Sequence, residues 1–380
     1  MADLFTQIRH LFKHLFCIKM LLMISKIIEK INFKLLIPAL FVYLLSLISI
    51  YSTIPTLAVN HFVYFIIGII IFCLLQVIDS DFFINYSKYI YSLVILLLIL
   101  IFIIGHTALG ASRWLKIGSL SIQPSEFAKI SLILLLTNIW SGLRIWNLKF
   151  FEIKNRFIQG LILFIPLVSL VVVQPDLGTS IIIFLIFLIM LTFSSFDKKY
   201  ILWFFLISCA FSGTFWNLLH DYQRERVVIF INPEIDKFGA GYNSIQATIA
   251  VGSGGLYGKG YQKGTQTQLN FLPIFWTDFL VATFAEEWGF TGLFIFILFY
   301  GIFINEIKEI AMKSTKTRHR LIVLGIFTYF CFQFLINVGM NLGLLPVTGI
   351  PVPLFSYGGT SLISSIFLLG ILNKISVELK

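Results

Sequence analysis

The sequence predicts an all-α, polytopic integral membrane protein with about ten transmembrane helices. Its composition is the first reason: hydrophobic residues make up 58% of the 380 residues and charged residues 12%, too few polar side chains to cover a soluble globule. The second reason is that apolar runs recur to the end of the chain at the ~20-residue length that a helix needs to cross a membrane. They are too long and continuous for the strands of a closed barrel, the other structure that lipid admits.

Ten apolar runs are expected to form these helices. They cover residues 35–53, 61–78, 86–105, 126–142, 157–174, 178–195, 200–219, 278–304, 320–341 and 359–378. The fifth and sixth runs could also form one helix with a break between them. Residues 34–380 are predicted to form a single transmembrane domain, with a large extracytoplasmic loop at 220–277 between the seventh and eighth helices. Residues 1–33, with Lys and Arg scattered among apolar residues, indicate a cytoplasmic, interfacial amphipathic helix rather than a cleaved signal peptide.

The distribution of Lys and Arg sets the orientation. With the N-terminus in the cytoplasm, 20 of these residues fall in cytoplasmic segments and seven in outer loops. We therefore expect a multi-pass protein of the cytoplasmic (inner) membrane with both termini in the cytoplasm. The net charge of +10 follows from this topology and from attraction to anionic lipid, so no nucleic-acid partner is expected. The informative polar segments all fall on the outer face, where the active site is expected.

Asp278 is the first candidate for a functional residue. It lies where the loop enters an apolar helix, in the segment LNFLPIFWTDFLVATFAEEWG. Acids near or inside a membrane need partners or water and are retained mainly for chemistry or transport. Glu286 lies about 12 Å further along the helix at ~1.5 Å per residue, and we expect it to be structural or to line a cavity. Asp278 is the better general base, because the polar loop reaches it.

The outer loop GASRWLKIGSLSIQPSEFAK holds two further pairs of charged residues. Glu126 and Lys129 lie three residues apart at a helix start, so they form either a structural ion pair or one border of a polar cavity. Arg113 and Lys116 flank Trp114 and either meet a phosphate or anchor the segment at the membrane interface.

Two breaks in the apolar pattern carry candidate site residues. Asp176, in QPDLGTS, lies between Pro175 and Gly178, which interrupt the helix. It either caps the following helix or lines the cavity that faces Asp278, because broken helices at membrane depth need protein or water around them. The segment NVGMNLGLLPVTGIPVPLFSYGGTS, residues 337–361, has prolines and glycines that predict an irregular, re-entrant path, as a plug or as the floor of the cavity.

The loop at 220–277 is far longer than a connection needs. Eight glycines lie between Gly239 and Gly264, and glycines let backbone amides approach an anion such as a lipid-linked phosphate. Its candidate phosphate-binding bases are Arg224, Arg226, Lys259 and Lys263. The alternative is a solvated loop whose glycines only make turns. Residues 243–251 predict a short amphipathic helix with Gln246 on its polar side. No P-loop signature occurs, so no nucleotide is expected as a cofactor, and no haem is expected either.

Six motifs in this order resemble the SEDS family of shape, elongation, division and sporulation proteins. They are GASRWLKIG, QPSEFAKI, QPDLGTS, GYNSIQATIAVGSGGLYGKG, TDF with AEEWG, and GIPVPLFSYGGTS. The resemblance covers most of the chain from about residue 35 onward. The segments GHTALGASRWLKIG and NVGMNLGLLPVTGIP are more similar to the elongation (RodA-type) branch of the family than to its division (FtsW-type) branch.

The resemblance implies ten membrane helices and a peptidoglycan glycosyltransferase. Such an enzyme polymerises lipid II at the outer face of the membrane through β-1,4 bonds, with inversion and release of polyprenyl diphosphate, during cell elongation and the maintenance of cell shape. It also implies that Asp278 is the essential aspartate, that Glu126 and Lys129 are the paired acid and lysine, and that Asp176 is the aspartate of the cavity.

The resemblance further implies partners and a cofactor, and in one motif this chain departs from the family's pattern. The expected partners are lipid II, the growing glycan strand, a class B penicillin-binding transpeptidase and other membrane proteins of the elongation complex, and a divalent cation, Mg²⁺ or Mn²⁺, is implied in the activity. The family usually has LPE, one variable residue, then HTDF, whereas this chain has LPIFWTDF. Ile274 therefore replaces an acid and Trp276 a histidine, so no auxiliary proton or metal role is assigned to these positions.

Other functions fit the same residues. A lipid II flippase would use the cavity and its charges to move the headgroup without breaking a bond. A division-type glycosyltransferase would carry out the same reaction at another stage of growth. A scaffold of the elongation complex, with catalysis weakened by the LPIFW change, is a further alternative.

Overall fold

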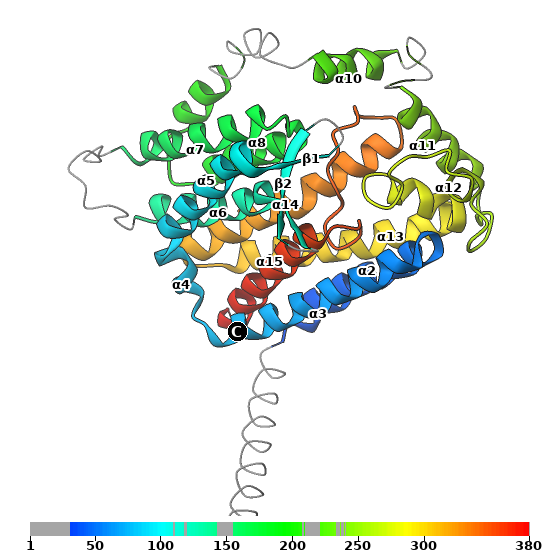
Figure 1. Cartoon of the computed structure of the whole chain (residues 1–380). Coiled ribbons are helices and arrows are strands. Elements are labelled where there is room, and N and C mark those ends of the chain that lie inside the picture. The colour runs from blue at the N-terminus through cyan, green and yellow to red at the C-terminus, as the bar shows by residue number, and fades with distance from the viewer. Residues whose placement is uncertain are drawn as a thin grey trace, which may run out of the picture.

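The structure is a computed structural model that describes residues 31–379 except 109–110, 118–119, 143–154, 207–208, 210–220, 233–235, 237–238 and 240. Most of its helices lie side by side in a bundle, and α10 lies apart from the others (Figure 1). They are α2 (Phe33–Thr53), α3 (Pro55–Val77), α4 (Ser80–Asn85), α5 (Ser87–Ile104), α6 (Pro124–Trp140), α7 (Arg156–Val173), α8 (Leu177–Thr192), α10 (Asp221–Ile231), α11 (Tyr242–Ser253), α12 (Thr265–Gln268), α13 (Leu280–Lys313), α14 (Thr317–Asn341) and α15 (Gly359–Glu378).

Seven helices within the described residues are long and apolar enough to cross a membrane. They are α2, α3, α5, α7, α13, α14 and α15, and α8 is a shorter apolar helix. Each starts and ends within a few residues of an expected span, except that α3 begins at Pro55 and α13 continues to Lys313. The expected span at 200–219 lies mostly outside the described residues, as does the interfacial helix expected at 1–33. The count of ten spans and the position of the large loop between the seventh and eighth therefore stay predictions.

The ends of the helices follow from local sequence. Pro55 and Pro124 lie in the first turns of α3 and α6, where the missing N–H of proline has no partner to lose. Asp176 accepts a hydrogen bond from the backbone N–H of Thr179 and so caps α8, as one of the two readings of QPDLGTS predicts. Asn32 caps α2 in the same way.

The core of the bundle surrounds α6, which is buried almost along its whole length. Its side chains are buried on every face, the pattern of a helix with protein on all sides. The neighbours of α6 are α5, α7, α8 and α14, while α13 packs against α2 and α14, and α15 packs against α3. The helix α13 is broken at Gly289, whose backbone is non-helical (φ 64°, ψ −163°).

The expectation of an all-α chain is wrong in one segment, although the protein is mostly helical. Three short strands, β1 (His106–Ala108), β2 (Ala111–Ile117) and β3 (Leu120–Ile122), form an antiparallel sheet in the order β1-β2-β3. In β2, Leu115 is buried and Lys116 is exposed, the alternation of a strand. A search for long apolar runs cannot detect strands of this length.

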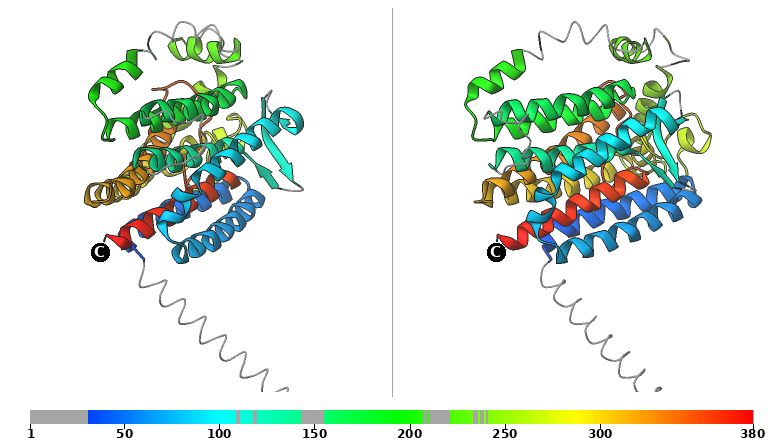
Figure 2. Two further views of the ribbon diagram at one scale, coloured as in Figure 1. Left: turned by 90° about the vertical axis from the view of Figure 1, so that its left-hand side faces the viewer. Right: turned by 60° about the vertical axis from the view of Figure 1, so that its left-hand side comes forward.

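The polar segments lie at one end of the bundle, here called the site end. At this end α2, α5, α7 and α14 finish, and α6, α8, α13 and α15 begin. The sheet and the α11–α12 region lie at the same end (Figure 2). The opposite end is joined by polar contacts such as Arg318 Nη1 to Asp81 Oδ2 (2.5 Å) and Asn373 Nδ2 to Gln76 Oε1 (2.7 Å).

Candidate functional site

Asp278 lies at the site end, just before α13, and is partly buried. Two asparagines of α14 hold its main chain, because the Nδ2 atoms of Asn337 and Asn341 donate to its carbonyl oxygen at 2.9 and 3.0 Å. The Oδ1 atom of Asn341 also accepts from the backbone N–H of Ala282, at 3.1 Å. The start of α13 is therefore fixed to α14, and the Asp278 side chain is aimed from a rigid base.

The segment between α14 and α15, residues 342–358, passes directly beside the Asp278 carboxylate. It is irregular, as its glycines and prolines predict. A Cβ atom on Gly349, which has a φ of +72°, would lie 3.6 Å from Asp278 Oδ2. The path is fixed by hydrogen bonds from Asn337 Nδ2 to the carbonyl of Ile350 (2.7 Å) and from the N–H of Tyr357 to the carbonyl of Trp276 (3.1 Å).

Two arginines contribute positive charge around Asp278. Burial raises the pKa of Asp278 to about 6, while the charges of Arg226 and Arg113 oppose that rise and the charge of Asp176 adds to it. Arg226 donates to the carbonyl of Val347 at 3.0 Å, which fixes α10 to the segment 342–358. Arg113, on β2, donates to the carbonyls of Gln174 and Pro175, so the sheet carries it to the break between α7 and α8.

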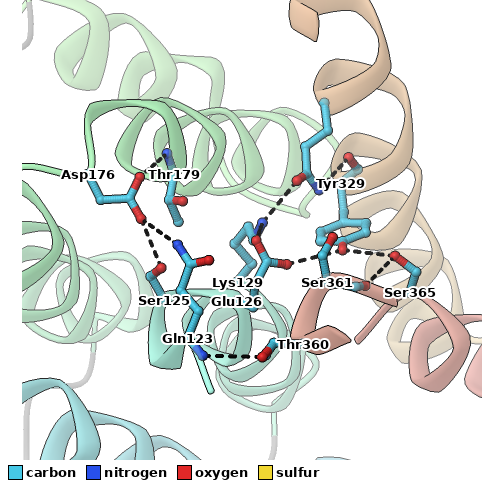
Figure 3. Close-up of polar contacts among 11 residues, drawn as sticks. Gln123, Ser125, Glu126, Lys129, Asp176, Thr179, Tyr329, Thr360, Ser361 and Ser365 are labelled. Atoms are coloured by element: carbon cyan, nitrogen blue, oxygen red, sulfur yellow. Dashed lines mark hydrogen bonds and ion pairs between the residues drawn. The ribbon is translucent and has the colours of Figure 1, made fainter. Parts of the chain in front are cut away.

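Asp176 is enclosed by hydrogen-bond donors. Its Oδ2 atom accepts from Gln123 Nε2 at 3.2 Å and from Ser125 Oγ at 2.9 Å, and its Oδ1 atom accepts from the N–H of Thr179 (Figure 3). The side chain thus links the start of α6 to the start of α8. The contacts of Asp176 confirm that it caps α8, and its charge also raises the pKa of Asp278. Its place in the lining of a cavity stays a prediction.

Glu126 and Lys129 form a buried ion pair on α6, with Lys129 Nζ 2.7 Å from Glu126 Oε1 and both side chains at most 2% exposed. Lys129 also donates to Gln333 Oε1 at 3.0 Å and lies over the ring of Tyr329, whose hydroxyl donates to Glu126 Oε2 at 3.4 Å (Figure 3). The pair therefore joins α6 to α14, as the structural reading predicts. Its role at a substrate cavity stays a prediction.

The remaining basic candidates lie in varied surroundings. Lys259 pairs with the buried Glu286, at 2.6 Å between Nζ and Oε1. Lys263 and Lys116 are exposed, on the loop after α11 and on β2, and Arg224 is partly buried on α10. Gln246 is partly buried on α11, which confirms the short helix predicted at 243–251.

Two glycines of the large loop fit tightly against α13. A Cβ atom on Gly254 would lie 2.1 Å from the carbonyl oxygen of Ala285, and one on Gly258 would lie 2.1 Å from that of Glu287. These two glycines therefore let two stretches of backbone approach each other closely. Anion binding by the loop stays a prediction.

Sequence reasoning missed the amides that support the acids. Asn337 and Asn341 are four residues apart on a mostly apolar helix, so they share one face. That spacing predicts a polar contact inside the bundle, although it does not identify Asp278 as its partner. Gln123 and Ser125 precede or begin α6 and could have been suggested only by the break in the apolar pattern there.

Ile274 and Trp276, which replace the family's acid and histidine, are both partly buried just before Asp278. Ile274 has a φ of +54°, in the left-handed region that branched side chains rarely adopt. Trp276 contacts Phe275 edge-on at 4.9 Å and packs against a small cluster, here called the mouth cluster. Its buried members are Ala247, Ala250, Leu272, Phe275, Phe279 and Ala282.

A metal ion would find few protein ligands here. The described residues hold no group of three His, Cys, Asp or Glu side chains arranged for metal binding. Asp176 already accepts three hydrogen bonds, which leaves Asp278 as the carboxylate beside the two arginines. These residues do not form a ligand set for Mg²⁺ or Mn²⁺ by themselves, so the cation stays a prediction.

Comparison with known proteins identifies the family. The family model of FtsW, RodA and SpoVE, described as cell cycle protein, matches residues 26–380. The chain is 38% identical over 314 residues to the peptidoglycan glycosyltransferase MrdB of Escherichia coli K12, covering 82% of this chain and 84% of that protein. Such similarity, with seven apolar helices among the described residues, makes the chain a multi-pass membrane protein.

Two solved chains have the same fold. One comes from work on the structural coordination of polymerization and crosslinking by a peptidoglycan synthase complex, with a TM-score of 0.76, 26% identity, and coverage of 92% of this chain and 98% of that chain. The other is a mutant of the rod shape determining protein RodA of Thermus thermophilus, with a TM-score of 0.66, 25% identity, and coverage of 91% and 97%. The chain therefore belongs to the FtsW, RodA and SpoVE family, the SEDS proteins.

Proposed function

We propose that this protein is an elongation-type peptidoglycan glycosyltransferase that polymerises lipid II, with Asp278 as its general base. Similarity to proteins named for this activity supports the reaction class. The observation that carries the role of Asp278 is its place: a partly buried carboxylate at the site end, with a pKa of about 6, flanked by an irregular backbone segment and influenced by two arginines. A base with a pKa near the working pH is suited to accept a proton in the transition state.

The reaction is the transfer of a sugar from a lipid diphosphate. The 4-hydroxyl of the acceptor sugar attacks the anomeric carbon of the donor, a new β-1,4 bond forms, and the bond from that carbon to the diphosphate oxygen breaks. Asp278 takes the proton of the attacking hydroxyl. The polyprenyl diphosphate leaves with the electron pair of the broken bond, and the α-linkage of the donor becomes a β-linkage.

The leaving diphosphate needs positive charge, and the contacts of the basic residues support a choice among them. The charge of Lys129 is balanced by Glu126, and that of Lys259 by Glu286. Arg113 is held by backbone carbonyls, which orient a guanidinium without neutralising it. Arg113 and Arg226 also act electrostatically on Asp278, so they are the two cations that we assign to the diphosphate.

The proposed function also includes an orientation in the membrane and partner proteins. The site end faces the outer side of the cytoplasmic membrane, where the growing glycan strand lies, and both termini face the cytoplasm; the asymmetry of Lys and Arg supports this orientation. The likeness to a chain from a complex that polymerises and crosslinks supports a class B penicillin-binding transpeptidase as the partner, together with other elongation proteins.

The test is polymerisation of lipid II by purified protein. Wild type should release polyprenyl diphosphate and make glycan chains, and Asp278→Asn should make none while keeping its thermal unfolding temperature. Glu309→Gln, on an exposed pair at the far end of α13, is the matched control and should keep full activity. Polymer from Asp278→Asn would refute the role of that residue. Movement of lipid II by wild type across vesicle membranes without any polymer would favour a flippase.

A further inference from the structure

Glu286 is a fully buried carboxylate that the proposed reaction does not use. Its Oε1 atom accepts from Lys259 Nζ at 2.6 Å, from Thr265 Oγ1 at 3.1 Å and from the N–H of Gln266 at 3.0 Å. Its Oε2 atom accepts from Thr267 Oγ1 at 3.3 Å. Every one of these donors belongs to one segment, residues 254–272, here called the strap. A single acid of α13 therefore holds the strap at several points.

The strap also pairs with α13 through its backbone, on both sides of the break at Gly289. The N–H groups of residues 259 and 260 donate to the carbonyls of Glu286 and Glu287, each at 3.0 Å. In the other direction, the N–H groups of residues 290 and 291 donate to the carbonyls of Gly255 and Leu256, at 2.9 and 3.1 Å. The break exposes backbone groups that an intact helix would use itself, and the strap satisfies them.

The strap continues directly into the active-site loop. The N–H of Leu272 donates to the carbonyl of Gln266 at 3.1 Å, and Leu272 lies in the mouth cluster with Phe279. Residues 266–278 thus form a loop that is held to Glu286 of α13 at its start and ends at Asp278, just before the same helix. Loss of the Glu286 contacts would free the start of this loop while the Asn337 contact to Asp278 remained.

We propose that Glu286 is a positioning residue that, with Lys259, holds the strap in the break of α13 and thereby sets the place of Asp278 relative to residues 342–358. This role rests on the proposed function only in the second experiment below, which measures polymerisation. The charge of Lys259 matters because a buried carboxylate without a cation is costly. Glu286 itself does not touch the reacting atoms: its four donors come from the strap.

The first experiment measures amide hydrogen exchange of the full chain in detergent and needs no activity. Glu286→Ala should speed exchange of residues 264–277 by about tenfold or more relative to wild type, because the anchored loop opens locally. Glu309→Gln should leave these amides unchanged. Unchanged exchange of residues 264–277 in Glu286→Ala would overturn the inference, whatever the protein catalyses.

The second experiment measures kcat and KM for lipid II polymerisation, per folded molecule. Glu286→Ala should lower kcat by roughly 100-fold, the cost of an ~1 Å misplacement, and change KM by less than about threefold. Lys259→Met should lower kcat less. Adding Glu286→Gln to Lys259→Met should restore part of kcat, because a neutral amide needs no cation. A wild-type kcat in Glu286→Ala would overturn the inference, and so would a double variant whose kcat is no higher than that of Lys259→Met. Polymerisation by Asp278→Asn tests the proposed function separately.

Discussion

Asp278 should set the acid limit of polymerisation. With a pKa of about 6, roughly nine tenths of its carboxyl groups are ionised at pH 7 and about one tenth at pH 5. The base must be ionised to accept a proton, so the initial rate should fall by about tenfold between pH 7 and pH 5. An aspartate at its ordinary value of 3.8 would leave the rate nearly flat over that range.

The same rate measurement tests the charges around the acid. Arg226→Gln removes the largest cationic influence on Asp278, so the pKa should rise and the midpoint should move to higher pH. Arg113→Gln should shift the midpoint in the same direction but less, because its influence is smaller. Lys313→Gln, at the other end of α13, is the control and should leave the profile unchanged. A midpoint of the pH–rate profile below pH 5 in wild type would refute the reasoning, and so would a midpoint that is the same in Arg226→Gln as in wild type.

Two stability predictions follow from buried contacts. Lys129→Met leaves Glu126 buried without its cation and should destabilise the fold by about 3–5 kcal/mol, and adding Glu126→Gln should recover much of this loss. Denaturant titration in detergent measures both effects. An unchanged unfolding midpoint in Lys129→Met would contradict the prediction. Gly258→Ala should cost at least ~1–3 kcal/mol, because its Cβ would clash with the carbonyl of Glu287 and its φ is +82°. Gly301→Ala, with open space around it on α13, should instead stabilise the fold by up to ~1 kcal/mol, and equal effects of the two glycine variants would refute the packing argument.

Much of the fold could be predicted from the sequence because lipid imposes a strong rule. A spanning helix must satisfy its own backbone and be apolar over ~20 residues, so α2, α5 and α15 lie almost where the runs predict them. The sheet escaped prediction because its strands are short and their pairing depends on residues outside any apolar run. The length of α13 also escaped, since its break at Gly289 is stabilised by a distant segment rather than by local sequence.

The acidic residues of the candidate site are easier to recognise in the sequence than the basic residues that lie near Asp278. Asp278, Asp176 and the Glu126–Lys129 pair are conspicuous in an apolar chain, and the structure gives the last two the capping and pairing contacts that their spacing predicts. Which bases approach Asp278 depends on how the sheet and α10 fold back over the bundle, so Arg113 and Arg226 could not be distinguished from Lys259 by sequence.

Ile274 shows how far the position of the acid depends on the whole molecule. A branched residue in the left-handed region costs about 1–3 kcal/mol and persists only where its surroundings enforce it. Here Leu272 and Phe275, on either side of Ile274 in the chain, are buried in the mouth cluster, whose other members come from α11, from the end of the loop and from α13. An isolated peptide of this loop would relax to another conformation. The geometry around Asp278 therefore depends on distant parts of the chain that pack together, so a short motif around this residue would not carry the geometry into another protein.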